Sequence, residues 1–179
     1  AVWTSYTCTI LCSLQSRWNY PIGILTTFLY SWLFFQWEAY AMAAFNLYLV
    51  FSLMFGYWRW GPDGEKSKEV THLKLDRWLL GYIGLGVIIY GVLQICIQFF
   101  GMNISNPELW ATVLSGVAQF LLDNKRIETW IVWAVVNIIS IGFYIHIELY
   151  LVAFQYMFFL ANTFYGYYMW KRSMNEPRT

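Results

Sequence analysis

The sequence predicts an all-α integral membrane protein with seven transmembrane helices. Of its 179 residues, 59% are hydrophobic and 22% aromatic, whereas only 12% are charged. Soluble domains contain about 25% charged residues, so the composition is that of a membrane protein. The number of apolar runs and the distribution of positive charge along the chain support seven spans.

Seven mostly apolar runs follow one another along the chain. They lie at residues 1–15, 18–36, 39–58, 78–100, 108–123, 127–145 and 149–170. A transmembrane helix needs about 17–25 apolar residues, so the first and fifth runs are short. The only long polar connection is 59–77, in which Gly61-Pro62-Asp63-Gly64 predicts a turn. No charged stretch precedes the first run, so we expect no cleavable signal peptide, and the natural N-terminus is expected to begin before this sequence.

All eleven Lys and Arg residues fall on one side of the membrane if the chain crosses it seven times. They lie in the first, third and fifth connections and after the last run, whereas Glu108 and Glu148 lie on the opposite side. The positive-inside rule therefore predicts an outside N-terminus and a cytoplasmic C-terminus. The net charge of +1 offers no basic patch, so no nucleic-acid partner is expected.

Residues 1–60 align with residues 111–170 at a constant offset of 110 without a gap. The nine identical pairs include Gly56/Gly166 and Trp60/Trp170, and the helix ends fall in register. We therefore expect a 3+1+3 parallel repeat. The predicted parts are a first three-helix bundle (1–60), a cytoplasmic loop with a connector helix (61–107), and a second bundle with a short cytoplasmic tail (108–179).

Polar and aromatic side chains recur at helical spacing on one face of each of the last three runs. The faces are formed by Thr112, Ser115 and Gln119, by Trp130, Trp133, Asn137, Ser140 and Tyr144, and by Gln155, Phe159, Asn162 and Gly166. An amide in hydrocarbon either joins helices or binds a polar ligand. Spacing alone leaves both interpretations open for Asn137 and Asn162.

Two simpler interpretations apply to other residues. Aromatic side chains near the helix ends are expected in the membrane–water interface, namely Trp18, Tyr20, Trp58, Trp60, Trp130 and Trp170. Cys8 and Cys12 share a helix face, but packing is expected of them rather than metal binding because no other ligand lies near them in sequence.

The sequence contains no pattern that supports catalysis or driven transport. No Lys lies within a run, and Asp123, the deepest acidic residue, is close to a helix end. Proton-coupled carriers keep such groups in the membrane interior. Glycine-rich phosphate motifs, catalytic triads and metal-ligand clusters are also missing from the pattern. We expect a protein that is not an enzyme and that needs no cofactor.

A set of short motifs spread over the chain carries a resemblance to a known family. The motifs are Val117-Ala118-Gln119, Lys125, Glu128-Thr129-Trp130, the run from Trp133 to Ser140, Leu160-Ala161-Asn162, Tyr165-Gly166-Tyr167 and Trp170, with Asn46 and the stretch from Phe55 to Trp60 in the first half. With these motifs the chain resembles the PnuC family of bacterial vitamin transporters. Asp123-Asn124-Lys125 departs from the family, in which a more basic run is expected.

The resemblance implies a SWEET-like facilitator of the bacterial inner membrane that passes nicotinamide riboside down its gradient. A cytosolic kinase would trap the vitamin by phosphorylation, and a homo-oligomer such as a trimer is compatible with the family. Trp133, Asn137, Asn162 and Gln119 match substrate-binding places, and Tyr144 joins them because it faces the same way. The alternatives are a thiamine or riboflavin transporter on the same fold, or a vitamin-binding membrane sensor that does not transport.

Overall fold

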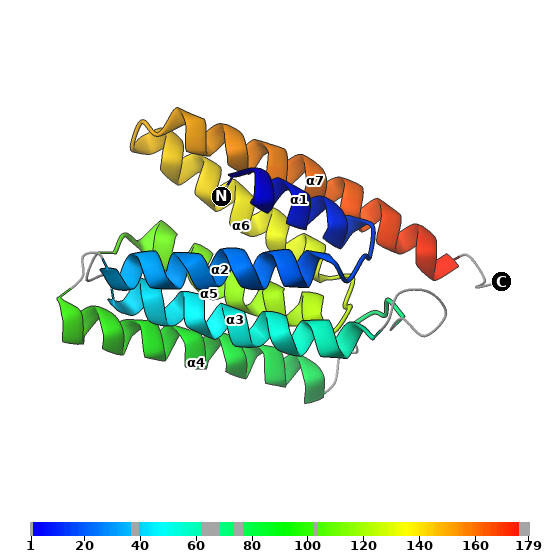
Figure 1. Ribbon diagram of the computed structural model, residues 1–179, viewed down its shortest axis with the longest axis horizontal. Coiled ribbons are helices and arrows are strands. Elements are labelled where there is room, and N and C mark those ends of the chain that lie inside the picture. Colours follow the sequence, from blue (N-terminus) through cyan, green and yellow to red (C-terminus); the bar gives the residue numbers. More distant parts are fainter. Residues whose placement is uncertain (1, 37–39, 62–68, 74–76, 102–103, 176–179) are drawn as a thin grey trace.

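The computed structural model describes residues 2–36, 40–61, 69–73, 77–101 and 104–175 (Figure 1). Within them lie seven helices, α1 (Val2–Ser13), α2 (Asn19–Gln36), α3 (Tyr40–Trp60), α4 (Arg77–Phe100), α5 (Asn106–Asp123), α6 (Thr129–His146) and α7 (Tyr150–Asn175). Each predicted run contains one helix, and the described residues form no strand beyond a single bridge between Thr71 and Arg126. The all-α prediction with seven helices is confirmed.

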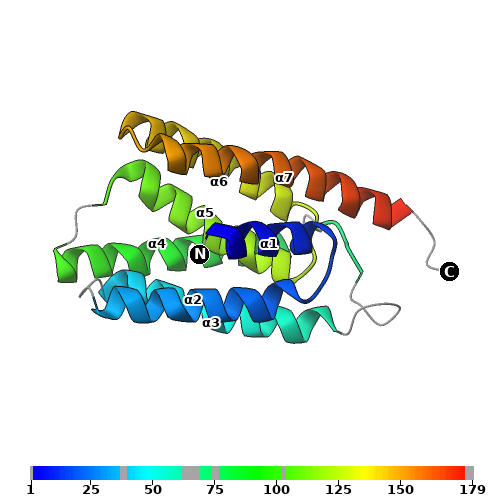
Figure 2. The same cartoon turned by 45° about the horizontal axis from the view of Figure 1, so that its top comes forward.

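The helices lie side by side along one axis, and consecutive helices alternate in direction (Figure 1). Figure 2 shows α6 and α7 at the top, α2 and α3 at the bottom, and α1, α4 and α5 between them. Accordingly, α1 contacts α2 and α7, and α5 contacts α3, α4 and α6. The C-terminal end of α7 lies at one end of the bundle, whereas the short α1 begins near the middle of the bundle's length (Figure 1).

Helix contacts among the first three helices have counterparts among the last three. The pair α1–α2 corresponds to α5–α6, the pair α2–α3 to α6–α7, and the pair α1–α7 to α5–α3. In the third pair, the first helix of each half packs against the third helix of the other half. The two halves are therefore interlocked rather than placed side by side.

Helices α1 and α5 end in the same type of turn, at positions 110 residues apart. Gln15 N donates to Cys12 O (3.0 Å), and Lys125 N donates to Leu122 O (2.8 Å). Gln15 and Lys125 both have a positive φ, of 57° and 49°. A left-handed residue after a helix, with these backbone bonds, is the Schellman motif, which satisfies carbonyls that the helix leaves open.

The outer surface of the bundle carries large apolar side chains. On α4, Leu80, Val87, Ile95 and Phe99 are 65% to 81% exposed. Exposed apolar side chains along one helix face are unfavourable in water and are typical of a surface that lipid covers. Two helical stretches, Leu80–Phe99 and Thr129–His146, are long and apolar enough to count as spans by themselves, with mean hydropathies of 2.1 and 1.6.

A short segment, Glu69–Leu73, crosses the end of the bundle at the turn between α5 and α6. Thr71 N donates to Lys125 O (3.0 Å), and Ile127 N donates to Thr71 O (3.1 Å). Glu128 accepts a bond from Leu73 N (2.9 Å). The end of the long connection is thus fixed on the second half, while Pro62-Asp63-Gly64 of the predicted turn lies outside the described residues.

Candidate functional site

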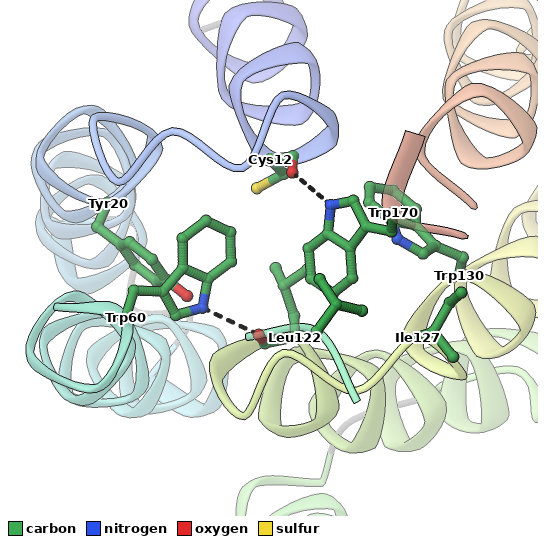
Figure 3. Close-up of a cluster of buried hydrophobic side chains, with 8 residues drawn as sticks. Cys12, Tyr20, Trp60, Leu122, Ile127, Trp130 and Trp170 are labelled. Carbon is green, nitrogen blue, oxygen red and sulfur yellow. Dashed lines mark hydrogen bonds between the residues drawn. The ribbon is translucent and has the colours of Figure 1, made fainter. Parts of the chain in front are cut away.

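Four aromatic side chains fill the end of the bundle at which α1 and α5 end. We call them the aromatic cluster: Tyr20, Trp60, Trp130 and Trp170 (Figure 3). Tyr20 packs edge to face on Trp60, with ring centroids 5.1 Å apart, and Trp130 packs in the same way on Trp170 at 5.3 Å. Trp60 and Trp170 join the two pairs at 5.9 Å. All four rings are at most 5% exposed, so they close this end of the bundle.

Two indole hydrogen bonds and two glycines hold the aromatic cluster. Trp60 Nε1 donates to Leu122 O (3.1 Å), and Trp170 Nε1 donates to Cys12 O (3.0 Å) (Figure 3). A Cβ atom at Gly56 would lie 2.3 Å from the Tyr20 ring, and one at Gly166 would lie 2.4 Å from the Trp130 ring. The rings therefore lie directly against the backbones of α3 and α7.

The interface prediction was wrong for all four members of the aromatic cluster. They face the interior of the bundle: Trp60 and Trp170 donate to the opposite half. Tyr20 and Trp130 lie against the helix backbone of their own half, where Gly56 and Gly166 leave room for a ring. Trp18 and Trp58, in contrast, are 65% and 73% exposed, as residues that contact lipid headgroups should be.

A central cavity of about 320 Å³ adjoins the aromatic cluster, since Cys12, Leu122 and Trp130 form part of its wall. Six helices line it, all except α4. Its polar lining consists of Ser5, Thr9, Asn19, Thr26, Thr27, Gln119, Asn137, Asn162 and Thr163, and its aromatic lining of Trp130, Trp133, Tyr156 and Phe159. Pockets for small molecules have volumes of about 300–1,000 Å³ and a similar mixture of apolar walls and a few polar groups.

Four of the five predicted site residues line the central cavity, namely Trp133, Asn137, Asn162 and Gln119. They come from the three helix faces that the periodicity of the sequence predicts, on α5, α6 and α7, and the structure brings these faces together. Tyr144 lies elsewhere. It lines a second cavity of about 340 Å³ and stacks on Tyr156, with ring centroids 5.3 Å apart.

The two asparagines also connect helices. Asn137 Nδ2 donates to Thr163 Oγ1 (3.1 Å), which joins α6 to α7. Asn162 Nδ2 donates to Thr9 O (3.1 Å), and its Oδ1 accepts from Ser13 Oγ (3.2 Å), so it joins α7 to α1. Both interpretations from the sequence are therefore physically compatible, because the same amides line the cavity and hold the helices. A ligand of Asn162 would have to replace or share its bonds with α1.

Asp123 is fully buried beside Gln119, and its carboxylate joins three helices. Its Oδ1 accepts from Gln119 Nε2 (2.9 Å) and from Tyr20 OH (3.1 Å), and its Oδ2 accepts from Ser52 Oγ (2.7 Å). Hydrogen bonds to a charged group contribute about 1.5–3 kcal/mol each, against about 1 kcal/mol for neutral pairs. At the offset of 110, the bond between Ser52 and Asp123 corresponds to that between Asn162 and Ser13.

Two buried polar atoms of residues in the cavity wall have no hydrogen-bond partner among the described residues. They are the indole donor Nε1 of Trp130 and the amide acceptor Oδ1 of Asn19. A buried polar group without a partner costs about 1–3 kcal/mol.

The sequence pointed to no residue of α1 for the cavity, and on α2 it pointed to Thr26 and Thr27, which do line the cavity, but not to Asn19. Ser5, Thr9 and Cys12 line the cavity from α1, and Asn19 lines it from α2. Steps of four and three residues along α1 would have indicated this face, as they did for α6. Gln155, expected beside Asn162, is not among the residues that line the cavity.

Known proteins match the chain over almost its whole length. The sequence pattern of a family described as nicotinamide mononucleotide transporter matches residues 1–172. A nicotinamide riboside transporter PnuC of Escherichia coli (strain K12) is 26% identical over 94% of this chain and 82% of its own length. A protein of the same name from Haemophilus influenzae is 26% identical over 92% of this chain and 74% of its own length.

A solved structure shows the same fold. The crystal structure of the vitamin B3 transporter PnuC superposes with a TM-score of 0.73 at 23% sequence identity. The match covers 97% of this chain and 81% of that protein. The arrangement of the seven helices is therefore shared with a transporter of known structure.

Proposed function

This chain belongs to the nicotinamide mononucleotide transporter family, and on that premise we propose that it carries nicotinamide riboside across the bacterial inner membrane. A member of a transporter family is a multi-pass membrane protein. The observation that carries the proposal is the central cavity, in which Trp133, Asn137, Asn162 and Gln119 converge.

The polar groups of this cavity suit nicotinamide riboside. The ligand has a carboxamide, ribose hydroxyls and a flat pyridinium ring with a permanent positive charge. The amide groups of Gln119, Asn137 and Asn162 can donate to and accept from a carboxamide. The face of Trp133 offers the pyridinium a cation–π contact worth about 2 kcal/mol when desolvated.

The lining of the central cavity favours binding of nicotinamide riboside over nicotinamide mononucleotide, the compound named in the family's description. A phosphate monoester carries a charge of about −1.5 to −2 at neutral pH. Buried charges require a paired charge of the opposite sign. Among the described residues that line the central cavity, none is Lys or Arg.

Transport by facilitated diffusion requires that each end of the cavity opens in turn. The aromatic cluster and the bonds of Asp123 close one end, and we propose that they form the inner gate. Release of the substrate toward this end requires that Tyr20 and Ser52 separate from Asp123, and that Ser13 separates from Asn162.

We further propose that the gate works through the 3+1+3 parallel repeat, with the parts 1–60, 61–107 and 108–179. The paired helix contacts, the matched turns after α1 and α5, and the matched indole bonds support this division. The proposed topology has an outside N-terminus and a cytoplasmic C-terminus, because Arg17, Arg59, Arg126 and Lys171 all belong to the predicted inner side. Trapping by a cytosolic kinase and a trimeric assembly are predictions from the family alone.

Substrate counterflow in proteoliposomes tests the function. Vesicles preloaded with unlabelled nicotinamide riboside should accumulate the labelled compound, and nicotinamide mononucleotide, thiamine and riboflavin should not compete. Competition by thiamine or riboflavin would assign another vitamin. Saturable binding in a calorimeter without counterflow would indicate a sensor instead of a transporter.

A further inference from the structure

The second cavity, of about 340 Å³, follows the central cavity along the same helices. On α5 it is lined by Glu108, Thr112 and Ser115, whereas Gln119 and Leu122 of the central cavity lie further along that helix. The second cavity is therefore on the side away from the aromatic cluster. A substrate that reaches the central cavity from that side passes through it.

Trp133 and Tyr156 border both cavities. Tyr144 stacks on Tyr156 within the second cavity, with an angle of 23° between the rings. Two sets of aromatic faces thus follow one another along a single route. A flat cationic ring can keep contact with Trp133 while it moves from one cavity to the other.

Among the described residues that line the second cavity, Glu108 is the only charged one. Its Oε2 accepts bonds from Ser105 N (3.2 Å) and Ser105 Oγ (2.7 Å), and Glu108 N donates to Ser105 Oγ (3.4 Å). This capping box holds the carboxylate at the start of α5. The cavity therefore combines one fixed negative charge with aromatic faces, which is a site for an organic cation.

Hydroxyl groups complete the lining. Thr112 Oγ1 donates to Glu108 O (2.8 Å), and Ser115 Oγ donates to Ala111 O (2.7 Å). Each hydroxyl has used its hydrogen, and its oxygen can still accept one. Sugar hydroxyls are suitable donors for these oxygens.

We propose that the second cavity is a separate outer binding site, where Glu108, Tyr144 and Trp133 hold the pyridinium ring of a nicotinamide riboside before it enters the central cavity. The proposal rests on the proposed function, since it takes the substrate from there. It gives Tyr144 a role in substrate capture and Glu108 a role in selecting a cation over neutral nucleosides.

Replacement of Glu108 tests this site. Glu108→Gln removes the charge and keeps the capping box, because Gln caps as well as Glu. Uptake of nicotinamide riboside by proteoliposomes is measured as a function of concentration. A partly exposed ion pair with added cation–π contact predicts a KM raised by about three- to tenfold at low ionic strength, with an unchanged maximal rate.

Three comparisons separate this effect from others. Glu108→Asp keeps the charge and should restore the KM to within about twofold of the wild type, since the attraction is Coulombic. Glu148→Gln removes an exposed charge on the proposed outer side that lines neither cavity, and it should leave the KM unchanged. High salt should shrink the difference between the wild type and Glu108→Gln, because screening weakens the attraction.

The proposal is overturned if Glu108→Gln has the KM of the wild type, if Glu148→Gln raises the KM equally, or if Glu108→Asp fails to restore it. Failure of the proposed function gives a different result, because the wild-type protein would then show no uptake of nicotinamide riboside.

Discussion

Trp60 and Trp170 pack against each other edge to face at the centre of the aromatic cluster, with an angle of 64° between their rings. Each donates its indole N–H to a carbonyl near the end of the first helix of the opposite half. Their positions differ by 110 residues, the offset of the proposed repeat. The two residues therefore link the halves twice, through equivalent bonds that run in opposite directions.

Loss of one indole bond should weaken this link. Trp170→Phe keeps a ring but removes the donor to Cys12 O, and it should lower the free energy of unfolding by about 1–3 kcal/mol, through the lost bond and the smaller ring. Thermal unfolding in detergent measures the change. Trp58→Phe, at a 73% exposed tryptophan, is the matched control and should have little effect. An equal loss in both variants would show that the bond contributes nothing.

A methyl group at Gly166 should disrupt the aromatic cluster. Gly166→Ala places a Cβ 2.4 Å from the Trp130 ring, and overpacking of this kind costs about 1–3 kcal/mol. Gly142→Ala is the control on α6, because a Cβ there meets nothing within 4 Å. The melting temperature in detergent should fall for Gly166→Ala alone. A wild-type value would mean that Trp130 can move away at no cost.

The bonds of Asp123 should keep the inner gate closed. Ser52→Ala removes one of them, and the gate should then open more often. Cys8 and Cys12 line the central cavity and can report this opening by their alkylation with a membrane-impermeant reagent from the C-terminal side. A Cys96→Ser background leaves these two thiols as the only ones in the chain. Alkylation should be several-fold faster in Ser52→Ala, and an unchanged rate would exclude Asp123 from gating.

Asn137 should contribute directly to substrate affinity. Asn137→Ala leaves a ligand group unpaired in a dry cavity, and the expected cost is about 1–3 kcal/mol of binding free energy. Calorimetric titration with nicotinamide riboside measures it. Thr163→Val is the control, since it removes the helix partner of Asn137 and keeps the amide. If both variants lose the same affinity, or if Asn137→Ala loses none, the residue is only a link between helices.

The positions of the helices could be predicted because hydrocarbon sets the length of an apolar run. The predicted run 127–145 and the observed helix Thr129–His146 differ by one or two residues at each end. The convergence of Asn137, Asn162 and Gln119 could be predicted because helical spacing assigns each residue to a face. Periodicity says nothing, however, about how far along a route a residue lies, and for this reason Tyr144 was grouped with residues of a different cavity.

The aromatic cluster could not be predicted by the rule that places Trp and Tyr at membrane interfaces. That rule uses the distance from a helix end, and Tyr20 and Trp60 are as close to an end as the exposed Trp18 and Trp58. Whether such a ring faces lipid or the interior of the bundle depends on small residues that come near it only in the folded protein. The sequence itself shows the matched pair Gly56 and Gly166, and two buried rings could have been predicted from this pair.

The bonds between the halves also bear on how the protein is made. Three buried donors of the first half, Trp60 Nε1, Tyr20 OH and Ser52 Oγ, have their partners in Leu122 and Asp123. During synthesis these partners leave the ribosome only after α4 and nearly all of α5. The first three helices therefore enter the membrane before their hydrogen-bond partners have been synthesised. We expect an α1–α3 fragment expressed alone to be degraded unless the second half is supplied in the same cell.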